Sequence, residues 1–105
     1  MTTKPKNGMR PVHPGEILAE DFMKPLSLSA NRLGGYLGVP PNRISAIVSG
    51  ERGVTADTAL RLAAFFDTTP GFWLGLQAEF DLRTAEIANG KEIAKIRPAS
   101  KVLVA

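Results

Sequence analysis

Residues 29–53 contain two short helical patterns of apolar and polar positions, separated by the break Gly38-Val39-Pro40-Pro41. Before the break, Leu33 and Leu37 stand four residues apart, so a helix places them on the same side. After the break, the apolar residues follow the i, i+3, i+4 spacing of a helix that packs on a core: Ile44, Ile47 and Val48. The pattern therefore predicts two short helices joined by a tight turn.

The opposite side of the second predicted helix has almost nothing to bury. Small or polar residues repeat there at helical spacing, with Arg43 beside them: Asn42, Ser45, Ala46 and Ser49. A short helix with one apolar side and one low-profile side rich in hydrogen-bonding groups fits the major groove of DNA. The segment thus predicts a helix-turn-helix. The alternative is an αα-corner in an ordinary helical domain, where this polar side is only solvated.

Local signals mark the ends of both predicted helices. Ser29 is a favourable N-cap, and Gly38 suits the left-handed residue that ends a helix. Pro41 can occupy the first helical turn without losing a hydrogen bond. Because Pro40 offers no capping side chain, we expect free N–H donors at this terminus, available to water or to a DNA phosphate.

The rest of the chain also predicts helices. One begins at Pro14 and ends by Pro25, and its core side is formed by Ile17, Leu18 and Phe22. The next is capped by Thr55 and extends to residue 66, with four residues at the spacing of a buried face: Leu60, Ala63, Ala64 and Phe66.

The longest predicted helix begins at Thr69-Pro70 and stops at Asn89-Gly90. Its apolar stripe consists of Trp73, Leu76, Phe80 and Ile87. Residues 101–105 have a strand-like composition, but this single short run predicts only a tail or an edge strand.

Composition limits the class of protein. With 105 residues, the chain is expected to form one domain with a modest core. No apolar run approaches the ~20 residues that span a bilayer, and no signal peptide opens the sequence, so we expect no membrane partner. The absence of cysteine excludes disulfides and thiolate metal sites and fits a reducing cytoplasm, where a DNA-binding protein would be associated with the nucleoid.

Charge is unevenly distributed along the chain. The net charge is only +3, but residues 1–13 carry three basic residues and no acid, and residues 29–53 carry three arginines against Glu51 alone. Acidic residues gather in the first predicted helix and in the middle of the chain. This separation suits a polyanionic partner. We expect a flexible basic arm at residues 1–13, a helix-turn-helix domain at 14–97 and a tail at 98–105.

Other candidate sites are weaker. The spacing of His13, Glu16 and Glu20 suggests a metal site, but a single histidine without cysteine argues against it. The better interpretation is that Glu16 reaches back to cap its helix. The only histidine lies at a helix start without a visible catalytic partner, so we expect neither an enzyme nor a cofactor.

Three separated motifs resemble the HigA antitoxins, which belong to the Cro/repressor-like (XRE) helix-turn-helix proteins. They are HPGEIL at His13–Leu18, VPPNRISAIVSGERGVTADTALRLAAFF at Val39–Phe66, and TPGFWLGLQAEFDL at Thr69–Leu82. The resemblance spans about residues 9 to 97 and includes the unusual FWLGLQ run at Phe72–Gln77. It implies an all-α, compact five-helix DNA-binding domain that dimerises, represses its own toxin–antitoxin operon and neutralises a RelE-like ribonuclease toxin. The tail after Arg97 matches no family pattern.

The resemblance also assigns DNA contacts, with the second helix of the motif as the recognition helix. Its outward face comprises Pro41, Asn42, Ser45, Ala46 and Ser49. Asn42 is the best candidate for reading a base, because its amide can pair with adenine through two hydrogen bonds. Arg43 is expected at a guanine or, more commonly, a phosphate. Contacts with the sugar-phosphate backbone of the DNA are implied for Asn31, Arg32 and Arg52.

Two further surfaces are assigned to protein partners. Aromatic and leucine residues of the longest helix could belong to the core or to a homodimer interface: Phe72, Trp73, Leu76 and Phe80. The acidic side chains Glu16, Glu20 and Asp21 would then remain free for a basic toxin. Two alternatives stay open, namely an XRE-type regulator without a toxin partner and a protein-interaction module that no longer binds DNA.

Overall fold

The structure, a computed structural model, describes residues 10–103, and this range is helical without any β-strand. The first helical run consists of α1 (Pro14–Ile17), the π-helical η1 (Leu18–Met23) and the 3-10 turn η2 (Lys24–Leu26). It is followed by α2 (Ala30–Leu37), α3 (Pro41–Val48), α4 (Ala56–Phe66), α5 (Pro70–Ala94) and the single turn α6 (Ala99–Val102). If the first run is counted as one helix, five helices build the described body, which confirms the all-α expectation.

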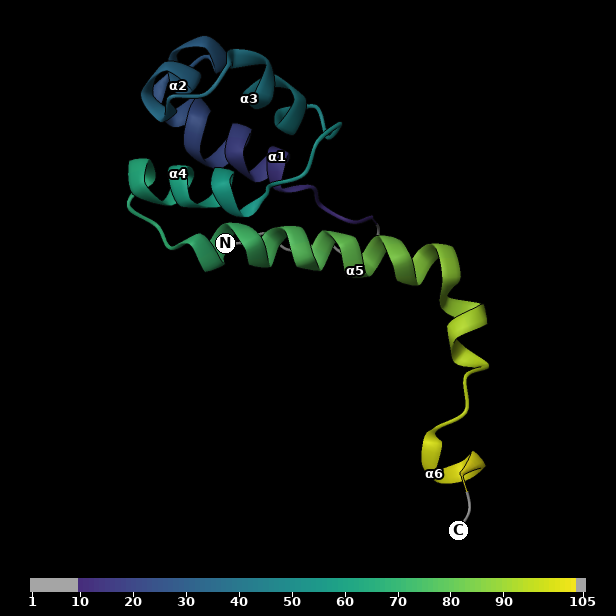
Figure 1. The fold of residues 1–105 in the computed structure, drawn as a ribbon. Helices are drawn as coiled ribbons and strands as arrows, with labels where there is room; N and C mark the ends of the chain where they lie inside the picture. Colours follow the sequence, from purple (N-terminus) through teal and green to yellow (C-terminus); the bar gives the residue numbers. More distant parts are fainter. Residues whose placement is uncertain (1–9, 104–105) are drawn as a thin grey trace.

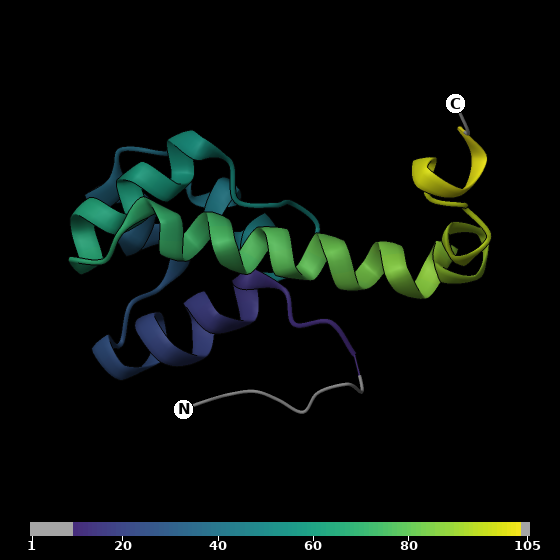
Figure 2. The same cartoon turned by 90° about the horizontal axis from the view of Figure 1, so that it is seen from below.

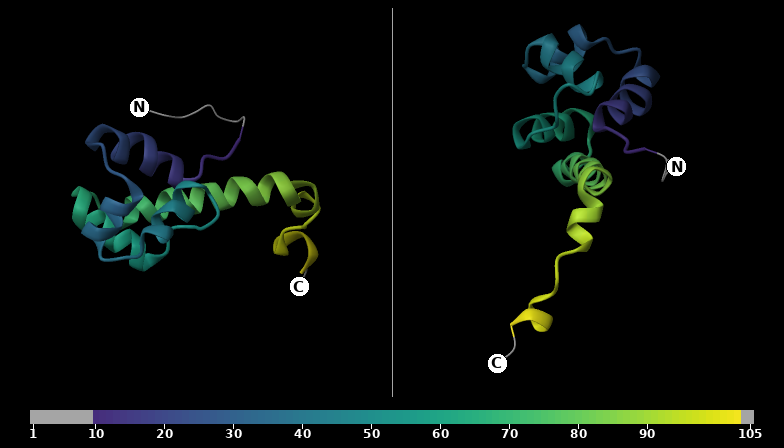
Figure 3. Two further views of the ribbon diagram at one scale, coloured as in Figure 1. Left: turned by 90° about the horizontal axis from the view of Figure 1, so that it is seen from above. Right: turned by 90° about the vertical axis from the view of Figure 1, so that its right-hand side faces the viewer.

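The helices are stacked on α5, which forms the base of the body (Figure 1). The first helical run and α4 flank α5 on its two sides (Figure 2). The α2–α3 pair lies at one end of the molecule and α6 at the other (Figure 3). Because α5 continues well past the body, the overall extents are 59 × 28 × 24 Å.

The first helical run and the helices α2 to α5 send apolar side chains into one shared core. Six of the largest are fully buried: Leu18, Leu33, Ile44, Ile47, Leu62 and Trp73. Burying a side chain of this kind contributes roughly 1.5–3 kcal/mol each. The Trp73 indole also donates a hydrogen bond to Thr68 Oγ1 at 2.8 Å, so its one polar atom is satisfied. The core therefore fixes α2 and α3 through their buried sides, which include Leu33, Ile44 and Ile47.

The start of α1 packs directly on the end of α3. A Cβ atom placed on Gly15 would lie 1.8 Å from the Ile47 carbonyl oxygen, so only glycine permits this approach. The contact fixes the C-terminal end of α3 against the rest of the body.

Two details of the helix predictions are wrong. The first helical run is a regular α-helix only for its first turn, and it ends at Ser27 with φ of 53°. In α4, Leu60 and Ala64 are exposed, whereas the buried positions are Thr58, Ala59, Leu62 and Ala63, with Phe66 packed against them. The buried side of α4 thus includes Ala59 and Leu62, on either side of Leu60 in the sequence, and leaves Leu60 itself in solvent.

The predicted stop at Asn89-Gly90 is also wrong, because α5 continues to Ala94. Gly90 does not adopt the left-handed conformation that ends a helix, and the last turn closes instead at Lys95. Residues 99–102 form a helical turn rather than a strand. No helix in the range 10–103 has the length and hydrophobicity needed to cross a membrane.

Candidate nucleic-acid interface

The turn between α2 and α3 forms as its sequence predicts. Ser29 Oγ accepts a hydrogen bond from the Arg32 N–H at 3.1 Å and caps α2. Gly38 ends α2 with φ of 73°, and the Val39 N–H donates to the Gly34 carbonyl at 2.9 Å. This Schellman-like closure redirects the chain into α3 within three residues, Gly38 to Pro40.

α3 presents the side that the sequence assigns to DNA. Ile44 and Ile47 are fully buried behind it, whereas Pro41, Asn42, Ser45 and Ser49 are exposed and Ala46 is half-buried. The two serine hydroxyls donate to carbonyls of the same segment, at 3.3 Å for Ser45 to Pro41 and 3.1 Å for Ser49 to Ala46. These hydrogen bonds hold both hydroxyls close to the helix, and the hydroxyl oxygens can still accept hydrogen bonds from a ligand.

At the N-terminus of α3, one backbone N–H group has no hydrogen-bond acceptor within the described residues. Pro41 has no N–H, and the Arg43 N–H donates to the Pro40 carbonyl at 3.0 Å. The Asn42 N–H remains, next to the exposed Asn42 side chain. Backbone and side chain of this residue are thus both accessible at the same point.

Arg43 is held by α4 rather than projecting freely. Its Nη1 lies 2.9 Å from Asp57 Oδ2, and its side chain is only 25% exposed. Asp57 Oδ2 also accepts from Arg61 Nε at 3.0 Å, and Arg61 Nη1 donates to the Leu37 carbonyl at 2.8 Å. The hydrogen bonds from Arg61 and then Arg43 hold the pKa of the Asp57 carboxyl below its ordinary value. This network ties α3 and the end of α2 to α4.

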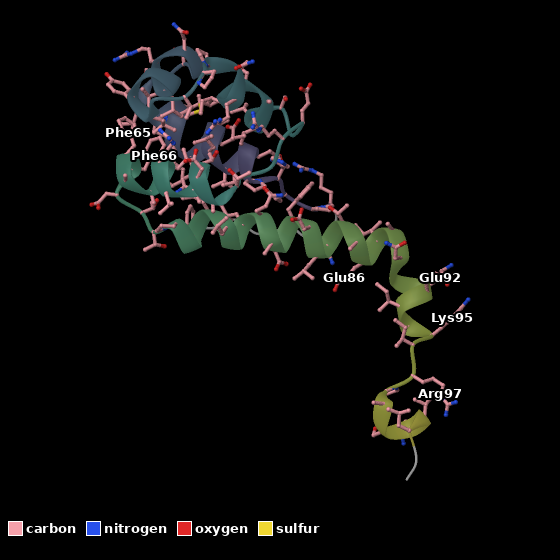
Figure 4. The ribbon with its side chains drawn as sticks, viewed as in Figure 1. Phe65, Phe66, Glu86, Glu92, Lys95 and Arg97 are labelled. Atoms are coloured by element: carbon pink, nitrogen blue, oxygen red, sulfur yellow. The ribbon has the colours of Figure 1, made fainter. Side chains whose placement is uncertain are left out.

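At the other side of α2, Arg32 lies beside an exposed aromatic pair. Its Nη2 donates to the Tyr36 hydroxyl at 3.2 Å, and its guanidinium carbon is 5.9 Å from the centre of that ring. The Tyr36 ring stacks on Phe65 at 5.1 Å. Figure 4 shows Phe65 and Phe66 near the end of α4, and Asn31 is exposed at the start of α2.

The loop that follows α3 carries Arg52 on the surface. Gly50 adopts φ of 83°, and the Glu51 and Arg52 N–H groups both donate to the Ala46 carbonyl, at 2.9 and 3.2 Å. At the far end of the loop, the Val54 N–H donates to Gln77 Oε1 at 2.7 Å. Arg52 forms no ion pair with the described part of the chain.

The capping role predicted for Glu16 is wrong, because His13 caps α1. Its Nδ1 accepts from the Gly15 N–H at 2.9 Å, and its ring meets Phe80 edge-on at 4.9 Å. Glu16 instead forms a two-pronged ion pair with Arg10, at 2.7 and 3.0 Å. The Arg10 hydrogen bond holds the pKa of Glu16 below its ordinary value.

Burial also lowers the pKa of His13 below its ordinary value of 6.5, although Glu16, Asp81 and the Arg52 backbone act in the opposite direction. The fold therefore favours the neutral ring, whose Nδ1 must stay unprotonated to accept the Gly15 N–H.

This arrangement predicts a pH dependence of stability. As pH falls below 6.5, the unfolded chain takes up a proton that folded His13 resists, so the free energy of unfolding falls until the lower folded pKa is passed. His13→Asn keeps a capping oxygen without the titration, so its stability should change less in this window. Urea unfolding of both proteins at pH 7.5 and pH 5.5 measures the difference. Equal pH dependence would exclude His13 as the source.

The surfaces assigned to protein partners need one correction. Trp73 has no exposed surface, so it belongs to the core of its own chain and cannot reach a second copy. Leu76 is packed against the core and Phe80 lies half-buried, whereas Phe72 is 40% exposed. A stripe of apolar residues at helical spacing lies exposed on the other side of α5: Leu74, Ala78, Leu82 and Ala85.

The acidic residues assigned to a toxin are partly neutralised within the chain. Glu16 pairs with Arg10, and Glu20 pairs with Lys24 at 2.7 Å. Asp21 is exposed and forms no ion pair with residues 10–103. Over the same range, no three His, Asp or Glu side chains gather as metal ligands.

Charged side chains also line the part of α5 and the segment after it that extend beyond the body. Figure 4 shows Glu86, Glu92, Lys95 and Arg97 projecting from this segment. Glu92 and Lys95 approach each other at 3.8 Å, and both are largely exposed. A pair of this kind adds little stability.

A short exposed helix, preceded by a capped helix and a left-handed glycine turn and supported by buried isoleucines, defines a helix-turn-helix protein. Comparison with known proteins agrees with this class. The chain belongs to the helix-turn-helix family, which matches residues 20–73, and within it to the HigA-type antitoxins.

Three relatives illustrate the match. Virulence-associated protein I of Dichelobacter nodosus is 51% identical over 77% of this chain and 75% of its own length. An addiction module antidote protein of the HigA family from Coxiella burnetii is 53% identical, with a TM-score of 0.81 over 86% of this chain and 99% of that one. The antitoxin HigA of Pseudomonas aeruginosa, solved with the higBA promoter, is 44% identical, with a TM-score of 0.82 over 85% of this chain and 98% of that one.

Proposed function

We propose that this protein is a DNA-binding antitoxin that represses its own toxin–antitoxin operon and neutralises a RelE-like ribonuclease toxin. The observation that carries the DNA-binding part is the exposed, low-profile face of α3 above two fully buried isoleucines. The Pseudomonas relative with the same fold is a HigA solved with the higBA promoter, which supports DNA binding by this protein.

The roles of individual residues divide into reading and positioning. Asn42 reads a base edge, supported by its exposed amide at the tip of α3. Ser45, Ser49 and Ala46 line the groove without obstructing it. Arg52 takes a phosphate, as do Asn31 and Arg32 at the start of α2. Arg43 reaches DNA only if a phosphate or guanine replaces Asp57 as its partner.

The protein acts as a homodimer. A single helix of eight residues, Pro41–Val48, contacts too few bases for operator-level affinity. The exposed stripe Leu74, Ala78, Leu82 and Ala85 offers a second copy an apolar surface on the side of α5 that faces away from the core. Self-association through it supplies the two-fold symmetry of a pseudo-palindromic operator.

DNase footprinting on the promoter of its own gene tests this function. We expect two protected half-sites about one helical turn apart, ~34 Å centre to centre. Truncation at Gly90 removes the end of α5 and the segment after it, and tests whether they contribute to the dimer. Leu82→Glu, within the exposed stripe, should weaken both dimerisation and operator binding. A single unsymmetrical protected half-site, or none, would contradict the proposal.

Toxin neutralisation separates an antitoxin from a regulator that lacks a toxin partner. The exposed Asp21, with Glu20 and Glu16 beside it, forms the acidic surface proposed for a basic toxin. Co-expression of this protein should restore growth to cells that produce the ribonuclease-like protein of an adjacent gene. The double charge reversal Glu20→Lys and Asp21→Lys should abolish this rescue while leaving operator binding intact. Rescue that survives the reversal would remove this surface from its role. The absence of any neutralised toxin would favour the regulator.

A further inference from the structure

We infer that Gln77 of α5 is a positioning residue for the DNA-phosphate contact of Arg52. This inference rests on the proposed function, because it concerns how the loop after α3 is held ready for DNA. Gln77 lies outside the helix-turn-helix segment and on a different helix from Arg52.

The loop is anchored at two points that bracket Arg52. On one side, the Arg52 N–H donates to the Ala46 carbonyl at 3.2 Å, which ties it to the end of α3. On the other side, the Val54 N–H donates to Gln77 Oε1 at 2.7 Å, and the Val54 side chain is buried. Only the Arg52–Gly53 link spans the two anchors. The position of the Arg52 Cα is therefore set from both ends.

Gln77 is itself fixed in one orientation. Its Nε2 donates to Asp81 Oδ1 at 3.0 Å, one turn further along α5, so the Oε1 atom is directed to the loop. Gly53 packs directly on this amide, since a Cβ atom on Gly53 would lie 3.0 Å from Gln77 Oε1 and 3.1 Å from Nε2. The side chain thus fills the space behind the loop as well as bonding to it.

The guanidinium of Arg52, by contrast, is exposed and unpaired with the described residues. A long exposed side chain on a loose loop loses conformational freedom on binding a phosphate. A loop held by Gln77 has already lost much of that freedom. Removal of the Gln77 acceptor should therefore weaken phosphate binding without changing any group that touches DNA.

The test is a double-mutant cycle of Gln77→Met and Arg52→Ala, measured on a short duplex of random sequence across a range of salt concentrations. Gln77→Met preserves the length of the side chain but removes the acceptor. We expect a several-fold weaker affinity at low salt and a log–log salt slope smaller by up to about 0.9 per protomer, the value for one phosphate contact. In the Arg52→Ala background, Gln77→Met should change neither quantity.

A second variant perturbs the same contact from the loop side. Gly53→Ala places a methyl group against the Gln77 amide and should reproduce the loss in affinity and slope, again only when Arg52 is present. Hydrogen exchange of the Val54 N–H in the free protein should accelerate in both variants. Unchanged far-UV circular dichroism would establish that each variant is folded.

The outcomes separate this inference from the proposed function. If the wild-type protein binds no duplex, the proposed function fails and the inference falls with it. If the wild-type protein binds DNA and both variants keep its salt slope, or if Gln77→Met and Arg52→Ala act additively, the inference alone is wrong. Should Gln77→Met not fold, Gly53→Ala decides by the same criteria.

Discussion

Replacement of Gly15 with alanine is expected to destabilise the fold by about 3 kcal/mol, the upper end of typical overpacking costs. The added methyl group would sit 1.8 Å from the Ile47 carbonyl oxygen, and the atoms in its way belong to the backbone of α3. Since a backbone cannot rotate aside like a flexible side chain, α1 and α3 must move apart. Urea unfolding followed by circular dichroism measures the change.

Gly35→Ala is the matched control. Gly35 lies within α2 with open space around the position of a new methyl group. Alanine is the better helix former, so this variant should gain up to ~1 kcal/mol. If Gly15→Ala unfolds at the same urea concentration as the wild-type protein, the close approach of α1 and α3 is not as the structure shows.

Asn42→Ala is expected to lower operator affinity by ~1–3 kcal/mol and to relax the preference at one base position. The amide is exposed at the start of α3, where a bidentate pair with adenine is sterically open. Competition binding against operator variants, one base at a time, measures the loss.

Arg52→Ala provides the contrast, because a phosphate contact carries no sequence information. It should weaken all duplexes alike and reduce the log–log salt slope by about 0.9 for each lost contact. Equal loss of specificity from Asn42→Ala and Arg52→Ala would mean that reading and positioning are assigned to the wrong residues.

Local rules predicted most of the helix starts. Ser29, Thr55 and Thr69 all cap their helices as expected, since each hydroxyl accepts from an N–H three residues ahead. The turn at Gly38 and the outward face of α3 also follow from short-range spacing. These features depend on neighbours within one or two helical turns, which a single sequence displays directly.

Features that depend on distant partners escaped prediction. Arg43 is held by Asp57, 14 residues away, and the Val54 N–H by Gln77, 23 residues away. Helical spacing places Leu60 and Ala64 on the buried side of α4, but the packing of α4 against its neighbours buries Ala59 and Leu62 in their place. The i, i+4 pair of Asp57 and Arg61 is visible in the sequence, but it lies within α4 and does not indicate that the same carboxylate also faces α3.

The length of α5 has a consequence for how the proposed self-association would depend on protein concentration. Residues 84–89 are exposed on the part of the helix past the body, so in a single chain their amides gain no protection from packing and should exchange with solvent far faster than those near Trp73. Association through α5 would slow that exchange by mass action, in step with protein concentration. Order in this segment would then rise as the protein accumulates, and with it the two-fold arrangement proposed above for operator binding.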